Sequence, residues 1–202
     1  MKKLLLTLGV ILLAVMLAAQ AEEAISSLDA AKELIKNQQY VKAQDEINFA
    51  LAKINEILAE ELLKFIPENP EGFKLEDKDA QALGAAGAIL GSANSIAATG
   101  DYSKGDASFK LTISVGGVLG QAGGLMGMAA MFGGMNAGGG KTIRVLGYSG
   151  TQEYDKGEKT GTLTIQVGDK ITVMVEGDEI ANADLLKTLA EKVDLAKLEK
   201  SF

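Results

Sequence analysis

The sequence predicts an α+β protein, in which a helical hairpin precedes an antiparallel sheet that helices cover. Apolar residues recur at helical spacing over residues 25–66. From residue 107 onward they alternate with polar residues in several segments, the pattern of strands with one buried face. A last helical stripe lies between residues 184 and 198. Helices that flank a group of strands are typical of the α+β class.

Residues 1–21 have the composition of a secretory signal peptide. Lys2 and Lys3 form a positive start, residues 4–17 form an apolar core, and Ala19-Gln20-Ala21 matches an A-x-A cleavage site. The apolar core is shorter than the ~20 residues that span a membrane. We therefore predict an exported, periplasmic protein that is cleaved after Ala21.

Composition and charge argue against several classes of function. Without residues 1–21 the chain has 18 Lys and Arg against 27 Asp and Glu, a formal charge of −9. Arg144 is the one arginine and there is no basic run, so we expect no binding of nucleic acid, which needs clustered cations. The chain has no histidine and no cysteine, which excludes Ser-His-Asp triads, Cys-His pairs and disulfides. We predict a non-enzymatic protein without catalytic residues or cofactors.

Residues 22–69 are predicted to form the helical hairpin. Asn37-Gln38-Gln39 marks a turn between two helices, and Pro67 and Pro70 end the second helix because proline lacks the backbone donor. The apolar residues of the two helices are Leu28, Ala31, Leu34, Ile35, Ala43, Ile47, Ala50, Leu51, Ile54, Ile57 and Leu58. We expect this hairpin to pack on its own domain or on a partner.

Residues 70–202 are predicted to form the α+β sheet domain, with about five strands. The two-residue loop Gly168-Asp169 is expected to join the last two strands, because glycine reaches a positive φ. Asn182 is expected to cap the C-terminal helix, and Asp194 a last short turn. The expected strands are a segment from Ser95 to Tyr102, Ala107–Val115, Thr142–Tyr154, Gly161–Val167 and Lys170–Glu176.

The sheet domain opens with Pro70-Glu71-Gly72-Phe73, a P-x-G-aromatic pattern at the start of a predicted strand. This opening, together with the order of elements from Pro70 to Leu198, resembles small exported bacterial proteins of uncharacterised role. It is also loosely similar to the α+β domains of the Mog1/PsbP-like class. The resemblance implies a fold and implies no activity.

A glycine-rich segment, residues 80–140, contains two stretches without charge, residues 80–100 and 111–140. Gly116, Gly120 and Gly124 repeat every fourth residue, a spacing that lets helices approach a neighbour closely. We favour a helix over Val118–Phe132 that packs on the sheet. The alternative is an envelope protein that associates with a membrane or oligomerises through this segment.

Three methionines, Met128, Met131 and Met135, share one face of that predicted helix. Thioethers are soft ligands that select Cu(I), but methionine also fills irregular gaps in protein cores. We favour core packing, with copper binding as the alternative. The expected partner is an unidentified envelope protein or a small ligand.

Overall fold

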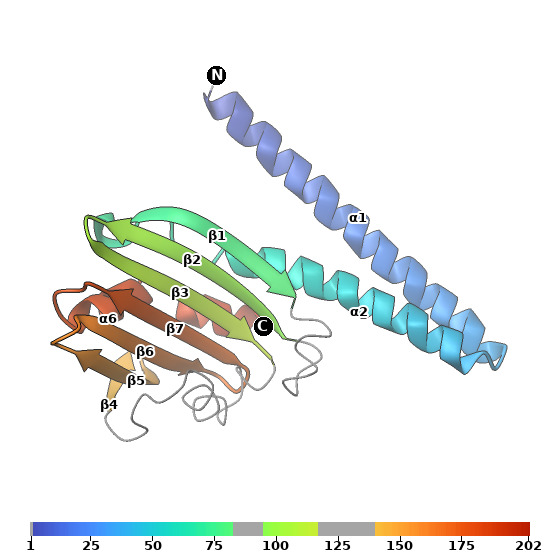
Figure 1. The fold of residues 1–202 in the computed structure, drawn as a ribbon. Coiled ribbons are helices and arrows are strands. Elements are labelled where there is room, and N and C mark those ends of the chain that lie inside the picture. Colours follow the sequence, from blue (N-terminus) through green and yellow to red (C-terminus); the bar gives the residue numbers. More distant parts are fainter. Residues whose placement is uncertain (1, 83–94, 117–139) are drawn as a thin grey trace. The chain divides into compact units, whose positions relative to one another are not determined.

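The computed structural model describes residues 2–82, 95–116 and 140–202. Two helices lead into a seven-stranded antiparallel sheet and two short helices follow it, so the predicted α+β class is confirmed (Figure 1). The chain divides into two compact units, Met1–Leu58 and Ala59–Phe202. The end of α2 (Tyr40–Leu63) therefore belongs to the second unit.

The first unit is a helical hairpin of α1 (Lys2–Lys36) and the larger part of α2, and the predicted turn between them is confirmed. Gln38 takes a φ of 58°, and the backbone N–H of Gln39 donates to the carbonyl of Leu34. Cleavage after Ala21 stays a prediction; α1 continues through that position as one helix. Among the residues described, no helix has an apolar stretch long enough to cross a membrane.

The sheet has the strand order β1-β2-β3-β7-β6-β5-β4, and every neighbouring pair is antiparallel. Its seven strands correct the prediction of about five. The strands are β1 (Lys74–Ala82), β2 (Ile96–Lys104), β3 (Ala107–Val115), β4 (Lys141–Val145), β5 (Tyr148–Asp155), β6 (Thr160–Val167) and β7 (Ile171–Asp178). A short 3-10 turn, η1 (Pro70–Gly72), precedes β1, so the P-x-G-aromatic opening is a turn rather than a strand.

The first difference concerns β1, at one edge of the sheet, which only the P-x-G-aromatic opening predicted. A β-bulge between Leu75 and Asp77 interrupts its register with β2. The Glu76 carboxylate accepts a hydrogen bond from the Ser103 hydroxyl at 2.5 Å, while Asp77 pairs with Asp101. Both acidic side chains thus lie on one face, and the bulge hides the period-two alternation that identifies a strand.

The second difference is that the segment predicted as one strand, Thr142–Tyr154, folds into β4 and β5. Val145 pairs with Tyr148 across Leu146 and Gly147, whose φ values are 50° and 95°. Two positive φ values make a type I′ turn, whose twist suits a hairpin. Leucine rarely adopts a positive φ, because its Cβ approaches the following carbonyl, so the sequence carries a weak turn signal there.

Replacing Leu146 with asparagine is expected to raise the free energy of unfolding by about 1 kcal/mol. Asparagine tolerates a positive φ, and Leu146 is 57% exposed, so the substitution removes little burial. Denaturant unfolding measures the difference. Leu146→Val serves as the control and is expected to destabilise, because a β-branched side chain is strained at this φ. An asparagine variant less stable than the wild type would contradict this account of the turn.

The turn between β6 and β7 has three residues, Gly168–Lys170, where two were predicted. Val167 pairs with Ile171, so Lys170 lies in the loop rather than in the strand. Gly168 has the expected positive φ, 58°. The Lys170 carbonyl accepts a hydrogen bond from the Gly116 N–H at 2.8 Å, which fixes this loop beside the end of β3.

One face of the sheet carries the core of the second unit. Its buried residues are Ile96, Ala98, Tyr102, Phe109, Leu111, Ile113, Leu163, Ile165, Val167, Ile171, Val173 and Val175. α6 (Asp184–Ala190) and α7 (Leu195–Ser201) add Leu186, Leu189, Leu195 and Leu198. The Asn182 side chain accepts the N–H of Asp184, although Ala183 holds the cap position, and Asp194 caps α7 as predicted.

Tyr102 ties β2 to the segment that follows α2. Its side chain is 1% exposed, and its hydroxyl donates to the Pro67 carbonyl at 2.7 Å. Burial, with a smaller contribution from the Glu68 carboxylate, raises the pKa of Tyr102 above its ordinary value. The phenol therefore stays protonated in the folded state at pH values where the unfolded chain ionises.

Replacing Tyr102 with phenylalanine is expected to lower the free energy of unfolding by about 1 kcal/mol at pH 7, because the Pro67 carbonyl loses its donor. Since the folded pKa is raised, the contribution of Tyr102 is complete below the unfolded value of about 10 and falls as pH rises above it. The wild type should lose stability more steeply than the variant between pH 9 and pH 11. Parallel pH profiles from denaturant unfolding would contradict this expectation.

Candidate functional site

The two hairpin helices meet along small side chains. The buried residues of this small-residue seam are Ala24, Ser27 and Ala31 in α1 and Ala43 and Ala50 in α2. They are three, four or seven residues apart, the heptad spacing of helices that run side by side. Because the distance between packed helices depends on the side chains at the contact, this seam allows a close approach. It also leaves the large apolar residues outside the contact.

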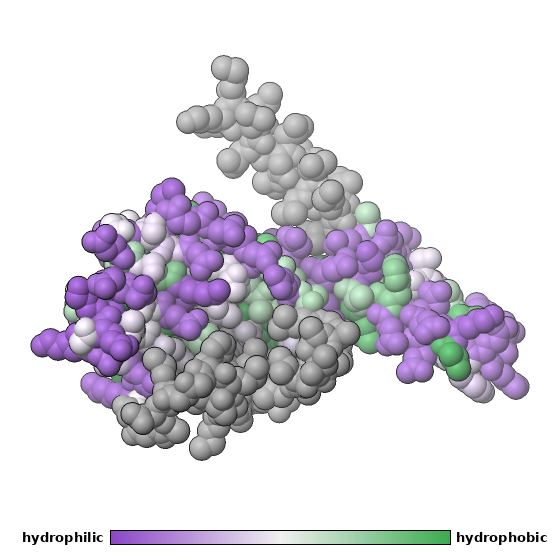
Figure 2. Space-filling model, viewed as in Figure 1, coloured by the Kyte–Doolittle hydropathy of each residue, from purple (hydrophilic) through white to green (hydrophobic). Residues whose placement is uncertain are grey.

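Large apolar side chains form a second stripe, one residue beyond the seam positions. We call it the apolar face; its members are Ile25, Leu28, Ile35, Tyr40, Ile47, Leu51 and Ile54, all exposed. Because the helices run in opposite directions, a step of one residue from the seam turns to the same side of the hairpin in both. Exposed fractions range from 36% for Ile54 to 64% for Tyr40. Figure 2 shows hydrophobic residues gathered along the hairpin between hydrophilic ones.

The other side of the seam carries a group of charged residues. The Lys53 ammonium lies 3.1 Å from the Glu23 carboxylate and 3.2 Å from that of Glu56, and Glu23 lies one residue before Ala24. The hydrogen bonds that the Lys53 ammonium donates to the Glu23 carboxylate and then to that of Glu56 raise the pKa of Lys53. The ion pair of Glu23 with Lys53 joins α1 and α2 on the side away from the apolar face, where the Lys53 ammonium also lies 5.5 Å from the centroid of the exposed Phe49 ring.

Residues at the same height along the two helices form a level of the hairpin, and one level of the apolar face is polar. Glu23 and Lys53, which form an ion pair, stand at equal distances in sequence before and after the turn residue Gln38. Residues placed symmetrically about Gln38 therefore lie side by side. By this relation Lys32 lies level with Gln44, both one residue beyond the seam, and large apolar residues stand above and below them.

A second surface is the face of the sheet opposite its core. The cross-strand register aligns one row of mostly threonine residues over six strands: Thr99, Thr112, Met174, Thr164, Thr151 and Thr142. Thr164 and Met174 are buried, whereas Thr142, at the edge, is exposed. No aromatic side chain belongs to this row, so it offers no ring for a ligand to stack on.

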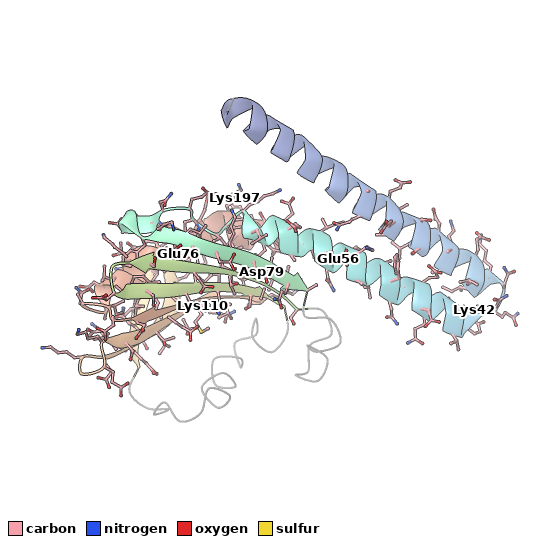
Figure 3. All side chains as sticks on the ribbon, turned by 45° about the horizontal axis from the view of Figure 1, so that its top comes forward. Lys42, Glu56, Glu76, Asp79, Lys110 and Lys197 are labelled. Atoms are coloured by element: carbon pink, nitrogen blue, oxygen red, sulfur yellow. The ribbon has the colours of Figure 1, made fainter. Side chains whose placement is uncertain are left out.

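Charged residues lie beside this threonine row near β1. Asp77 stands opposite Asp101, and Asp101 opposite Lys110. Figure 3 shows Glu76 and Asp79 on β1 and Lys110 on β3. Like charges directly across a strand pair are unfavourable. In the part of the chain that the structure describes, no group of three or more His, Cys, Asp or Glu is placed to hold a metal ion.

The structure describes only some of the residues that the sequence marks as candidate site residues. Met128, Met131 and Met135 and the predicted helix Val118–Phe132 lie outside it, so copper binding stays a prediction. Gly116 follows β3 directly, with a φ of 75°, and is not helical, so the every-fourth glycine series does not begin in a helix. In the glycine-rich segment 80–140, much of the described part belongs to β1, β2 and β3.

The apolar face is the candidate functional site that the sequence pattern did not distinguish from the buried helix contact. The sequence placed alanine and large aliphatic residues of each helix in one apolar group, yet the structure buries the alanines and exposes most of the large side chains. The available signal was the offset of one residue between two heptad series in both helices. Two adjacent series are typical of helices that contact more than one neighbour.

Comparisons with known proteins identify no relative of this chain. No protein-family model, curated protein or solved structure matches the chain. The resemblance to small exported proteins and to the Mog1/PsbP-like class therefore stays a prediction.

Proposed function

We propose that the protein is an exported, non-enzymatic binding protein, which docks a protein partner through the apolar face of its helical hairpin. One observation carries the proposal. Among the residues described, ten large hydrophobic side chains are exposed, and nine of them lie between Ile25 and Ile54; seven of the nine form the apolar face, and the other two, Val41 and Phe49, lie elsewhere on α2. The tenth is Leu146. A contiguous exposed apolar surface with a polar border is typical of an interaction site.

Charge supports a protein partner over a lipid surface. Residues 19–58 contain seven acidic residues and four lysines. An amphipathic helix that lies on an anionic membrane carries lysine or arginine on its polar side, whereas the polar side of this hairpin has Glu23 and Glu56 around Lys53. The absence of histidine and cysteine from the sequence supports binding rather than catalysis.

Site-specific photo-crosslinking tests the proposal. A benzophenone amino acid at Ile47, on the apolar face, is expected to give a protein adduct of discrete mass in cells. The same group at Ala52, exposed on the opposite side of α2, is the matched control and should give none. The proposal fails if Ile47 gives no intermolecular adduct, or if both positions label equally.

Export is tested separately. From the Ala19-Gln20-Ala21 pattern, the protein recovered after osmotic shock is expected to begin at Glu22. N-terminal sequencing of the released fraction measures this. A chain that retains its first residues and sediments with membranes would contradict export with cleavage.

A further inference from the structure

We infer that the partner on the apolar face is a second copy of this chain, so that two hairpins form a four-helix bundle with a two-fold axis along the helices. The inference rests on the proposed function, because it names the occupant of the same surface. Size is the first support. The seven side chains of the apolar face are each 36% to 64% exposed, so together they offer an area of the same order as the ~800 Å² that each partner buries in a standard interface.

The sequence pattern of the hairpin is the second support. Helices in a bundle carry apolar residues at the two seam positions of the heptad and at one adjacent position. Here the seam positions hold small residues such as Ala24 and Ala50, and the adjacent positions hold large ones such as Ile25 and Leu51. Within a single hairpin, only the seam residues are buried. The adjacent stripe is buried when a second hairpin packs on it.

Each level of the apolar face is complementary to the same level on a second copy. A rotation of 180° about an axis along the helices sets α1 of one copy against α2 of the other, with every level facing the same level. Leu28 then meets Ile47 of the second copy. At the polar level, the Lys32 ammonium meets the amide oxygen of Gln44 of the second copy, and the reverse contact forms by symmetry. Neighbouring helices also remain antiparallel, which suits their dipoles.

The polar level selects this arrangement over the other two-fold pairing. An axis perpendicular to the helices would place α1 against α1 in opposite directions, and Lys32 would then face either an apolar level or Lys32 of the second copy. Burying a lysine without a partner carries a large penalty. A single polar position in an apolar seam commonly fixes register and orientation in helical bundles. Lys32 and Gln44 therefore act as positioning residues for the dimer.

Sedimentation velocity on the mature protein, Glu22–Phe202, tests the inference. We expect a mass of two chains at micromolar concentration. Ile47→Lys should weaken self-association at least tenfold, because it buries a charge in an apolar level. Ala52→Lys, on the opposite side of the same helix, should leave it unchanged. Circular dichroism checks that both variants keep their helices. A wild type that stays monomeric, or equal effects of the two variants, would overturn the inference.

Orientation is tested with single cysteines, since the chain has none. Asn37→Cys lies at the hairpin turn, and the proposed axis brings both turns to the same end. A short bismaleimide should therefore join two Asn37→Cys chains. Ser26→Cys, exposed on the side away from the apolar face, should not be joined. A dimer whose turn cysteines stay unlinked would overturn the proposed axis.

Adduct mass at Ile47 separates this inference from the proposed function. An adduct of two identical chains supports both. An adduct with a different protein, from a chain that is monomeric alone, overturns the dimer and leaves the binding function standing. A crosslink within one chain would show that another part of the same chain covers the apolar face, and would overturn both.

Discussion

Replacing Gly161 with valine is expected to lower the free energy of unfolding by about 3 kcal/mol. A Cβ at Gly161 would stand 2.9 Å from the backbone carbonyl oxygen of Glu153 and 3.0 Å from the Leu186 side chain in α6. A backbone oxygen in the next strand cannot move aside without breaking its pairing. Valine adds two methyl groups to that overlap, so β5, β6 or α6 must shift.

The surroundings of Gly161 explain why the effect is large. Gly161 pairs with Gly177, where a Cβ would stand 2.9 Å from both Ile180 and Phe109. The two glycines together make room for side chains that close the end of the core. Thermal and denaturant unfolding measure the effect. Gly157→Ala is the control, because its Cβ would meet only the end of a side chain, and a change within about 0.5 kcal/mol is expected. A fully stable Gly161→Val variant would contradict this packing.

Replacing Leu163 with alanine is expected to cost about 3 kcal/mol of stability, in the range for a fully buried leucine. Leu163 is 0% exposed in β6 and stands opposite Val175 in the core face. The loss combines removed burial with a cavity that neighbouring strands cannot fill without changing their spacing. Denaturant unfolding of the whole chain gives the difference, read from the transition of the sheet unit.

Thr162→Ala is the matched control for Leu163→Ala, one residue earlier in the same strand. Its side chain points to the opposite face of the sheet, and the substitution is expected to cost less than about 1 kcal/mol. Comparable losses at the two positions would show that the threonine face is as tightly packed as the core face. That result would also weaken its description as a separate polar surface.

The sequence predicts the fold class well where one local pattern dominates. Ala107–Val115 and Gly161–Val167 were found from strict alternation, and the structure has strands at those positions. The turn at Gln38 was found because polar residues interrupt two apolar stripes. Helices and strands of this kind are encoded by neighbours in sequence, so no tertiary information is needed.

The strands that the local pattern defines poorly have tertiary causes. In β1 a bulge places Glu76 and Asp77 on one face, and pairing with β2 rather than side-chain alternation defines the strand. At Leu146 the pairing of β4 with β5 imposes a backbone conformation that leucine disfavours. The candidate binding surface was missed for a related reason. Composition shows that each helix has apolar residues, but only the distance between helices decides which of them are buried.

The charged edge of the sheet limits how this molecule can assemble. Free edges of a sheet can recruit strands from other molecules and form open-ended stacks. β1 presents Lys74, Glu76, Asp77, Lys78 and Asp79 along such an edge, and its bulge breaks the straight ladder that an incoming strand would need. Strand addition at β1 would bring like charges together and leave backbone groups unmatched. Association through the hairpin, in contrast, closes on itself after two copies. High local concentration should therefore favour association through the hairpin over strand addition at β1.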